Sequence, residues 1–401
     1  MDYVTLGRTE IKVCKNGFGA LPIQRISFDS AKEILLHAYN SGINFFDTAR
    51  FYTDSEEKIG YALSDVRDKI YIATKTAAQN ADDFWKDLNT SLNNMKTDYI
   101  DIYQFHNPSF CPKPNDGTGL YEAMLEAKAQ GKIRFIGLTN HRLAVAQEAI
   151  DSGLYDTIQF PFCYLATDKD IAIVENCKKN NLGFIAMKGL SGGLITNSAA
   201  AYAFMAQYDN VLPIWGVQRM SELNEFLSYN TNPPSVTGEI KELIDNDRKM
   251  LAGEFCRGCG YCMPCPVGIE INNCARMSLL LRRSPSELQL TPAVQAKMKK
   301  IEKAEPINEK KDKVKKIKKA IAKNENLYAS ETMRSLATLD GTGQKFSFEQ
   351  QNTPYFAISG TSTGGRGFYQ GIRNDLLWKG MNDSYSWIGR FQDWQNRFGS
   401  T

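Results

Sequence analysis

From Gly17 to Val217, short apolar segments alternate along the chain with amphipathic segments of helical periodicity. The apolar segments are rich in β-branched and aromatic residues, as buried parallel strands require. They span residues 17–23, 43–49, 69–76, 99–106, 133–140, 156–162, 183–189 and 211–217. The first helix can be capped by Asp29 and ended by Gly42. The later helices are expected to begin near Ser55, Ala81, Gly119, Arg142, Asp168, Ala199 and Ser221.

Eight successive βα units predict an α/β fold in which a parallel sheet closes into a (β/α)8 TIM barrel. An open, doubly wound sheet is the competing fold, but it would favour a glycine-rich GxGxxG turn after the first strand, and Gly17–Gly19 do not continue that pattern. Residues 3–13 predict a small hairpin that caps the barrel floor. The expected domains are a barrel over 1–250, a cysteine-rich region over 251–302, and a lysine-rich linker with an unassigned tail over 303–401. A helix over 234–251 is expected after the barrel, leading to the cysteine-rich region.

Composition narrows the class of protein. A hydrophobic share of 42% is enough for a large core. The formal charge of +3 hides a segment, 299–323, with eleven lysines and four acids, so the rest of the chain is net negative and does not predict nucleic-acid binding. No apolar run approaches the roughly 20 residues of a membrane helix. Unpaired cysteine spacing outside 256–265 and the lack of a signal-like start favour a cytoplasmic protein.

Polar residues stand at the carboxyl ends of three predicted strands, where apolar strands have no structural need for them. They are Asp47, Lys75 and His106, and Tyr52 follows Asp47 in the next loop. Each alone has an ordinary structural explanation. Because barrel enzymes carry their working residues at this end of the strands, the set together predicts an active site.

The motifs around these residues resemble those of the aldo-keto reductases. They are FFDTARFYTDSEEKIG, IATK, IYQFH and IGLTN, and the resemblance covers roughly residues 1–250. Residues 250–300 resemble the ferredoxin-like appendage of one branch of that family. The resemblance implies an NAD(P)-dependent oxidoreductase that reduces small aldehydes or ketones. Tyr52 would donate the proton, and the ammonium of Lys75, held by Asp47, would lower the tyrosine pKa from its usual value of about 10. His106 would orient the carbonyl oxygen.

The resemblance also implies a cofactor site for NAD(P)H. Thr139, Asn140 and Gln159 match positions that bind the nicotinamide carboxamide, and Met187 replaces an aromatic residue that is frequent under the ring. Further expected contacts are Leu190 and Gly192 near the pyrophosphate, and Gly216, Val217, Gln218 and Glu222 near the adenosine. Glu222 would disfavour the 2′-phosphate of NADP, whereas Arg219 would favour it, so the choice between NAD and NADP stays open.

The segment CRGCGYCMPCP holds Cys256, Cys259, Cys262 and Cys265 at intervals of three residues. Zinc sites usually join two separated CxxC pairs, whereas CxxCxxC followed by Cys-Pro is typical of iron–sulfur ligation. The pattern predicts one 4Fe–4S cluster. The second run of cysteines that the family's appendage usually carries is missing, which leaves Cys265 and Cys274 as candidates for the fourth ligand.

Two alternatives to a carbonyl reductase remain at this point. One is a non-catalytic barrel that senses the nicotinamide cofactor, and the other is a barrel that passes electrons between the cluster and a redox partner protein. Loss of a member of the Tyr52, Lys75, Asp47 and His106 set would favour a non-catalytic role, and all four residues are present. The sequence therefore favours catalysis but does not name the substrate or the oligomeric state.

Overall fold

Eight parallel strands close into a barrel in the computed structural model, which describes residues 2–251. The barrel strands are β3 (Gly17–Gly19), β4 (Phe45–Asp47), β5 (Tyr71–Thr76), β6 (Ile100–His106), β7 (Ile133–Thr139), β8 (Thr157–Pro161), β9 (Gly183–Met187) and β10 (Val211–Gly216). They follow one another around the barrel in chain order, and β10 pairs with β3 to close it. All eight strand predictions are confirmed, and the open-sheet alternative is wrong.

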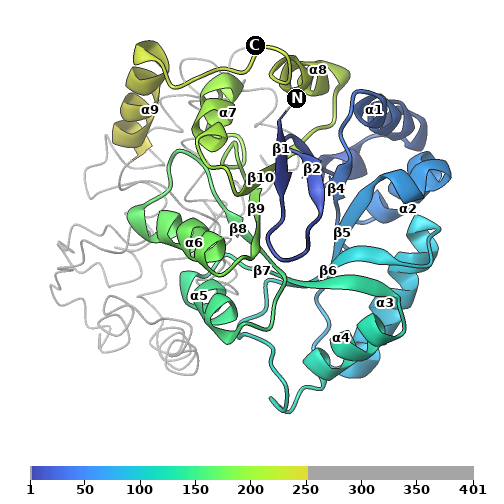
Figure 1. Ribbon diagram of the computed structural model, residues 1–401. Coiled ribbons are helices and arrows are strands. Elements are labelled where there is room, and N and C mark those ends of the chain that lie inside the picture. The colour runs from blue at the N-terminus through green and yellow to red at the C-terminus, as the bar shows by residue number, and fades with distance from the viewer. Residues whose placement is uncertain (1, 252–401) are drawn as a thin grey trace, which may run out of the picture. The chain divides into compact units, whose positions relative to one another are not determined.

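Helices surround the barrel (Figure 1). They are α1 (Phe28–Asn40), α2 (Ser55–Leu63), α3 (Ala81–Met95), α4 (Leu120–Ala129), α5 (Leu143–Ser152), α6 (Asp168–Lys179), α7 (Ser198–Ala206), α8 (Met220–Ser228) and α9 (Gly238–Leu251), with short 3₁₀ helices at Pro22–Arg25 and Ser64–Lys69. Two details of the prediction were wrong. Ser27, not Asp29, caps α1, because its side chain accepts a hydrogen bond from the Ser30 amide. Helix α9 begins at Gly238, four residues later than expected.

A two-stranded hairpin closes the amino-terminal end of the barrel, as the sequence predicted. Strands β1 (Tyr3–Thr5) and β2 (Lys12–Cys14) pair antiparallel, and the hairpin lies across the centre of the barrel in Figure 1. Its buried side chains pack against the lower interior of the barrel in one apolar cluster. We call this cluster the floor: Val4, Leu6, Ile11, Val13, Phe45, Ala73, Ile102, Ile185, Leu212 and Ile214. Because the floor is filled with side chains, the working end of the barrel is the carboxyl end of the strands.

Above the floor, the barrel interior changes from apolar to polar. We call this the polar layer: Asp47, Lys75, Gln104 and Gln159, each at most 2% exposed. Strand register places Lys75 beside Gln104, and Gln104 beside Gly137. Buried polar groups are costly unless they are hydrogen-bonded, so a layer of four such residues indicates a site rather than simple packing.

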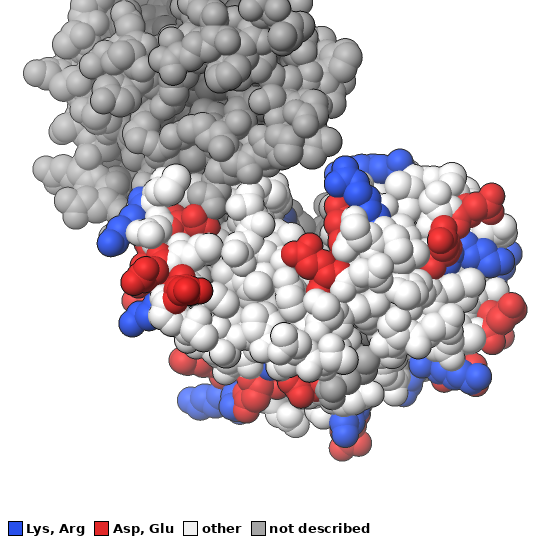
Figure 2. Space-filling model, turned by 90° about the horizontal axis from the view of Figure 1, so that it is seen from above, with Lys and Arg blue, Asp and Glu red and all other residues white. Residues whose placement is uncertain are grey.

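The surface and helices of the described residues add two observations. On the face that Figure 2 shows, Lys and Arg side chains alternate with Asp and Glu around the rim, without a continuous basic surface in the described part. Among residues 2–251, no helix combines the length and apolarity needed to cross a membrane.

Candidate active site

The buried ion pair between Asp47 and Lys75 lies at the centre of the candidate site. Lys75 Nζ donates to both carboxylate oxygens of Asp47, at 2.7 and 2.8 Å, and to the carbonyl oxygen of Thr48 at 2.6 Å. Burial raises the pKa of Asp47, and the Lys75 ammonium opposes that rise. Burial likewise lowers the pKa of Lys75, and Asp47 opposes that fall. Each charge is therefore kept in the barrel by the other.

Tyr52 lies above this pair in the loop between β4 and α2. The Lys75 Nζ atom is 5.4 Å from the centre of its ring. The expectation that Lys75 lowers the tyrosine pKa is wrong for this geometry, because burial, and then the charge of Asp47, raise the pKa of Tyr52. The Lys75 ammonium instead donates its hydrogen bonds to the Asp47 carboxylate and to the carbonyl oxygen of Thr48. Tyr52 consequently holds its proton through the neutral range, which is the state that a proton donor needs.

His106 ends strand β6 beside Tyr52. The two rings lie edge to face with centroids 5.9 Å apart, and the exposed Phe51 ring is 6.4 Å from His106 on another side. Burial, and then the charge of Lys75, lower the pKa of His106 to about 3. The imidazole is therefore neutral near pH 7 and can hydrogen-bond a carbonyl oxygen without carrying a charge. The structure thus places all four predicted catalytic residues at one end of the barrel.

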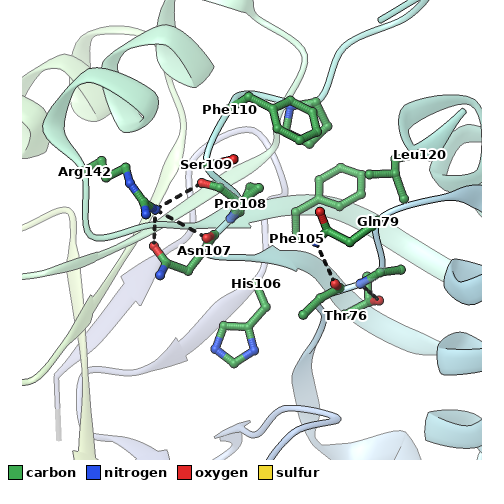
Figure 3. Close-up of a pocket in the computed structure, with 13 residues that line it drawn as sticks. Thr76, Gln79, Phe105, His106, Asn107, Pro108, Ser109, Phe110, Leu120 and Arg142 are labelled. Carbon is green, nitrogen blue, oxygen red and sulfur yellow. Dashed lines mark hydrogen bonds between the residues drawn. The ribbon is translucent and has the colours of Figure 1, made fainter. Parts of the chain in front are cut away.

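A pocket of about 240 Å³ opens next to His106 (Figure 3). Its walls are Thr76 at the end of β5 with residues 77–79 after it, residues 105–110 and 112 at and beyond the end of β6, Leu120 and Arg142. Arg142 fixes the second wall, because its guanidinium donates to the carbonyl oxygens of Asn107 and Pro108. Apart from His106, sequence reasoning missed these wall residues, since loop segments show no periodicity that would assign them to a site.

Of the three predicted carboxamide-binding residues, Thr139 ends β7, Asn140 follows it, and Gln159 lies in the middle of β8 as the register partner of Thr139. The Asn140 side chain is hydrogen-bonded within the protein. Its Nδ2 atom donates to Pro108 O at 2.8 Å, and its Oδ1 atom accepts from the backbone amide of Arg142 at 2.8 Å. Gln159 donates to Asp47 Oδ1 at 3.4 Å. The Thr139 hydroxyl lies 3.8 Å from Met187 Sδ, so these two predicted contacts are neighbours.

Gln104 is a polar-layer residue that sequence reasoning missed. Its side chain is fully buried and contacts both Asp47 and Gln159. The signal was present, because Gln104 lies two residues before His106 in a strand, and residues two apart face the same side. A buried amide on the inward face of an otherwise apolar strand could have been assigned to the site on that ground.

The segment after β9, which contains the predicted pyrophosphate contacts Leu190 and Gly192, forms a tight turn. Lys188, Ser191 and Gly192 have φ of 59°, 50° and 64°, in the left-handed region. The Gly193 amide donates to Leu190 O at 3.0 Å. Non-glycine residues in this conformation are uncommon and concentrate at functional sites. The contact of Leu190 and Gly192 with a pyrophosphate stays a prediction.

The start of helix α8 differs from a plain anion site. The Glu222 carboxylate accepts hydrogen bonds from the backbone amides of Gln218 at 2.9 Å and of Arg219 at 3.1 Å. It therefore occupies amides that a phosphate would otherwise use. Gln218 Oε1 is buried, and no described residue donates a hydrogen bond to it. Val217 is buried, whereas Gly216 is exposed beside it.

The predicted cluster ligands Cys256, Cys259, Cys262 and Cys265 lie outside the described residues, as does Cys274. Within residues 2–251, the structure contains no group of three or more His, Cys, Asp or Glu side chains suited to a metal ion. The cysteines of this part, Cys14, Cys111, Cys163 and Cys177, are all buried thiols.

Solved structures share this barrel. A putative aldo-keto reductase from Pseudomonas aeruginosa superposes with a TM-score of 0.52 at 21% identity, over 58% of this chain and 94% of its own. An aldo-keto reductase from Klebsiella pneumoniae, solved in complex with NADPH, gives 0.53 at 20% identity, over 61% and 95%. At these identities the likeness establishes the fold.

Curated relatives match parts of the chain. L-galactose dehydrogenase of Arabidopsis thaliana is 29% identical over 211 residues, which is 48% of this chain and 66% of the relative. Methylglyoxal reductase DkgB of Escherichia coli O157:H7 is 36% identical over 121 residues, or 28% of this chain and 43% of the relative. The chain thus spans less than two thirds of either relative.

The sequence profile of the aldo/keto reductase family matches residues 15–201. That range holds Asp47, Tyr52, Lys75 and His106, together with seven of the eight barrel strands. Over residues 15–201, the barrel of this chain is therefore similar to the aldo/keto reductase family.

Proposed function

We propose that this protein reduces small aldehydes or ketones with hydride from NADH or NADPH. One observation carries the proposal: a buried Asp47–Lys75 pair beside a protonated Tyr52 and a neutral His106, at the carboxyl end of the barrel strands. The relatives support it through their names, which include a dehydrogenase and a methylglyoxal reductase, and through the Klebsiella pneumoniae structure with NADPH.

In the proposed reaction the nicotinamide, when bound, supplies the hydride that goes to the carbonyl carbon. His106 hydrogen-bonds the carbonyl oxygen and stabilises the negative charge that develops there. Tyr52 donates its hydroxyl proton to that oxygen. Burial and the charge of Asp47 disfavour the tyrosinate that remains, and the Lys75 ammonium, 5.4 Å from the centre of the ring, would oppose these two effects.

The nicotinamide end of the cofactor fits the described residues. Thr139 and Gln159 are register partners on neighbouring strands. A carboxamide needs both a hydrogen-bond donor and an acceptor, and these two side chains can supply them. We propose that Thr139, Asn140 and Gln159 hold the carboxamide, that Met187 contacts the ring, and that the turn at Leu190 and Gly192 lies along the pyrophosphate.

The adenosine end fits through Gly216, Val217 and Gln218, of which Gln218 brings a buried acceptor. Glu222 caps the start of α8 with a negative charge, and a carboxylate there repels a 2′-phosphate while it can accept a bond from a free hydroxyl. We therefore propose that this position favours NAD over NADP.

We also propose that Cys256, Cys259 and Cys262 bind one 4Fe–4S cluster, with Cys265 or Cys274 as the fourth ligand. The support is the spacing of the cysteines in the sequence. The full chain, prepared without oxygen, should contain about four irons with matching sulfide. Cys265→Ser and Cys274→Ser separate the two candidate ligands, since only loss of the true ligand should lower the iron content. A count near eight irons, or zinc without sulfide, contradicts the proposal.

The reductase proposal is tested with the full chain, NADH or NADPH, and a panel of small aldehydes and ketones. Oxidation of the reduced cofactor is followed by its absorbance, with and without each carbonyl compound. We expect carbonyl-dependent oxidation, faster with NADH if Glu222 acts as proposed. Tight binding of either cofactor, with no oxidation by any carbonyl compound, would instead favour a cofactor-sensing barrel.

A further inference from the structure

Gln104 occupies a position between the two halves of the proposed site. On one side is Asp47, which holds Lys75, and on the other is Gln159, the proposed carboxamide contact. The Gln104 Nε2 atom is 2.8 Å from Gln159 Oε1 and 3.5 Å from Asp47 Oδ2. Gln159 Nε2 donates in turn to Asp47 Oδ1 at 3.4 Å. Two amides and one carboxylate therefore form a closed triangle, in which every donor points towards an oxygen.

The neighbouring strand leaves room for this arrangement. Gly137 on β7 pairs with Gln104 on one side and with Thr157 on the other. A Cβ atom at Gly137 would lie 2.7 Å from Gln104 Cγ and 2.6 Å from Thr157 Oγ1, both far inside van der Waals contact. Any larger residue at 137 would therefore displace the Gln104 side chain. The glycine makes the inward reach of Gln104 possible.

The acceptor end of Gln104 argues against a purely structural role. Gln104 Oε1 is buried, and none of the described residues donates to it. A buried acceptor without a donor destabilises the fold, and an apolar side chain of equal size would avoid this cost. The feature that an apolar side chain would lack is the pair of N–H donors on Nε2, and these point to Asp47 and Gln159.

The triangle fixes which way the Gln159 amide faces. Its Nε2 atom points to Asp47 and its Oε1 atom to Gln104, so the oxygen is held in place with a second lone pair left for a ligand donor. Without Gln104, the amide could rotate and present its nitrogen instead. A carboxamide ligand would then meet a mixture of orientations and bind more weakly.

We propose that Gln104 is a positioning residue that orients Gln159 for the nicotinamide carboxamide and ties that contact to the catalytic Asp47–Lys75 pair. The inference rests on the proposed function and deepens it. Asp47 is faced by Lys75 from β5, by Tyr52 from the loop after β4, and by the two amides from β6 and β8. The charge of Glu56 on α2 also raises the pKa of Lys75, and the charge of Lys75 lowers the pKa of His106.

The test compares Gln104→Met with Gln159→Met and with the double variant. Met keeps the length of the side chain and removes its amide. The dissociation constant of NADH and of NADPH is measured by fluorescence titration without a carbonyl compound. We expect Gln104→Met to weaken binding about tenfold in the wild-type background, and to change it less than twofold when Gln159 is already Met, because the effect passes through Gln159.

Tyr103→Phe is the matched control, since it removes a buried hydroxyl from the next position of the same strand, among helix-facing aromatic residues. It should leave cofactor affinity unchanged. A second readout is the pH profile of kcat: the amides of Gln104 and Gln159 lower the pKa of Asp47, so its acidic limb should move to higher pH in Gln104→Met. If that variant does not fold, Gln104→Asn, which draws the amide back by one methylene, should weaken binding in the same direction.

The outcomes separate this inference from the proposed function. Equal losses from Gln104→Met in both backgrounds, or no loss in either, would overturn the positioning role while the reductase stands. A wild-type chain that binds neither cofactor would overturn the proposed function itself.

Discussion

The floor and the polar layer of the barrel are built by the same strands, yet different interactions hold their buried side chains together. Along β6, Ile102 belongs to the floor and Gln104 to the polar layer, two residues further on the same face. The floor is packed from aliphatic and aromatic side chains and needs no hydrogen bonds. The polar layer buries an ion pair and two amides, and almost every polar atom in it is paired with another.

The two regions differ in what they contribute to the stability of the barrel. An apolar core stabilises the fold with many different combinations of apolar residues, as long as their total volume fits. A buried ion pair is seldom more stable than apolar residues of the same volume, because both charges lose their water. Its presence above an apolar floor is what the proposed reductase function would require.

The largest expected stability effect comes from breaking the ion pair. Lys75→Met leaves the Asp47 carboxylate buried without its cation, and should lower the free energy of unfolding by about 3–5 kcal/mol. The midpoint of urea denaturation measures this. Asp47→Leu in the same chain should recover most of the loss, and failure to recover it would contradict the account of the pair as mutually compensating.

Lys75→Met should also lower turnover far more than cofactor affinity, since Lys75 contacts Asp47, Thr48 and the ring of Tyr52. Titration with NADH and measurement of kcat on the same sample separate the two. Equal losses in both would instead assign Lys75 to cofactor binding.

A substitution in the floor should lower stability but leave turnover nearly unchanged. Ile102→Ala removes a fully buried side chain and should lower the free energy of unfolding by about 2–5 kcal/mol through the cavity that it leaves. At a temperature well below its melting point, the folded variant should keep its kcat within about twofold of the wild type. That margin corresponds to the error with which the effects of separate sites usually add. A kcat loss as large as that of Lys75→Met would remove the distinction between the layers.

Acid should weaken the fold through the working end, since the floor has no titratable group. Burial lowers the pKa of both His106 and His141, which lies two residues beyond the carboxyl end of β7, to about 3, well below the unfolded value of about 6.5. Between these values the unfolded chain binds more protons, so stability falls as the pH falls. Each histidine should contribute up to about 1.4 kcal/mol per pH unit. Melting temperatures at several pH values should show a shallower fall for His106→Gln than for the wild type.

The smallest effect should come from outside both layers. Glu222→Arg replaces the carboxylate at the start of α8 with a cation and should shift the ratio of NAD to NADP affinity by about tenfold towards NADP, or roughly 1.4 kcal/mol. Titration with both cofactors measures the ratio. The neutral control Glu222→Gln should give a smaller shift in the same direction, and an unchanged ratio would contradict the placement of the adenosine.

Much of the fold could be read from the sequence because buried parallel strands and amphipathic helices have different periods. The strand-end residues Asp47, Lys75 and His106 were found in the same way, since their polarity contradicts the strand around them. The tyrosine pKa could not be predicted, because it depends on how fully Asp47 compensates Lys75 in three dimensions. The Gln104 triangle depends on the register that sets Gly137 beside it, and register is not visible in one strand alone.

The central claim, that the polar end of this barrel reduces carbonyl compounds with Tyr52 as the proton donor, is tested most directly by Tyr52→Phe. This variant keeps the ring and removes only the hydroxyl. The measurement is kcat for the best aldehyde or ketone, beside cofactor affinity and the control Tyr61→Phe at a more exposed position on α2. The account predicts a fall in kcat of about 10²–10⁴-fold with cofactor affinity and the control unchanged. Turnover of Tyr52→Phe close to that of the wild type would contradict it.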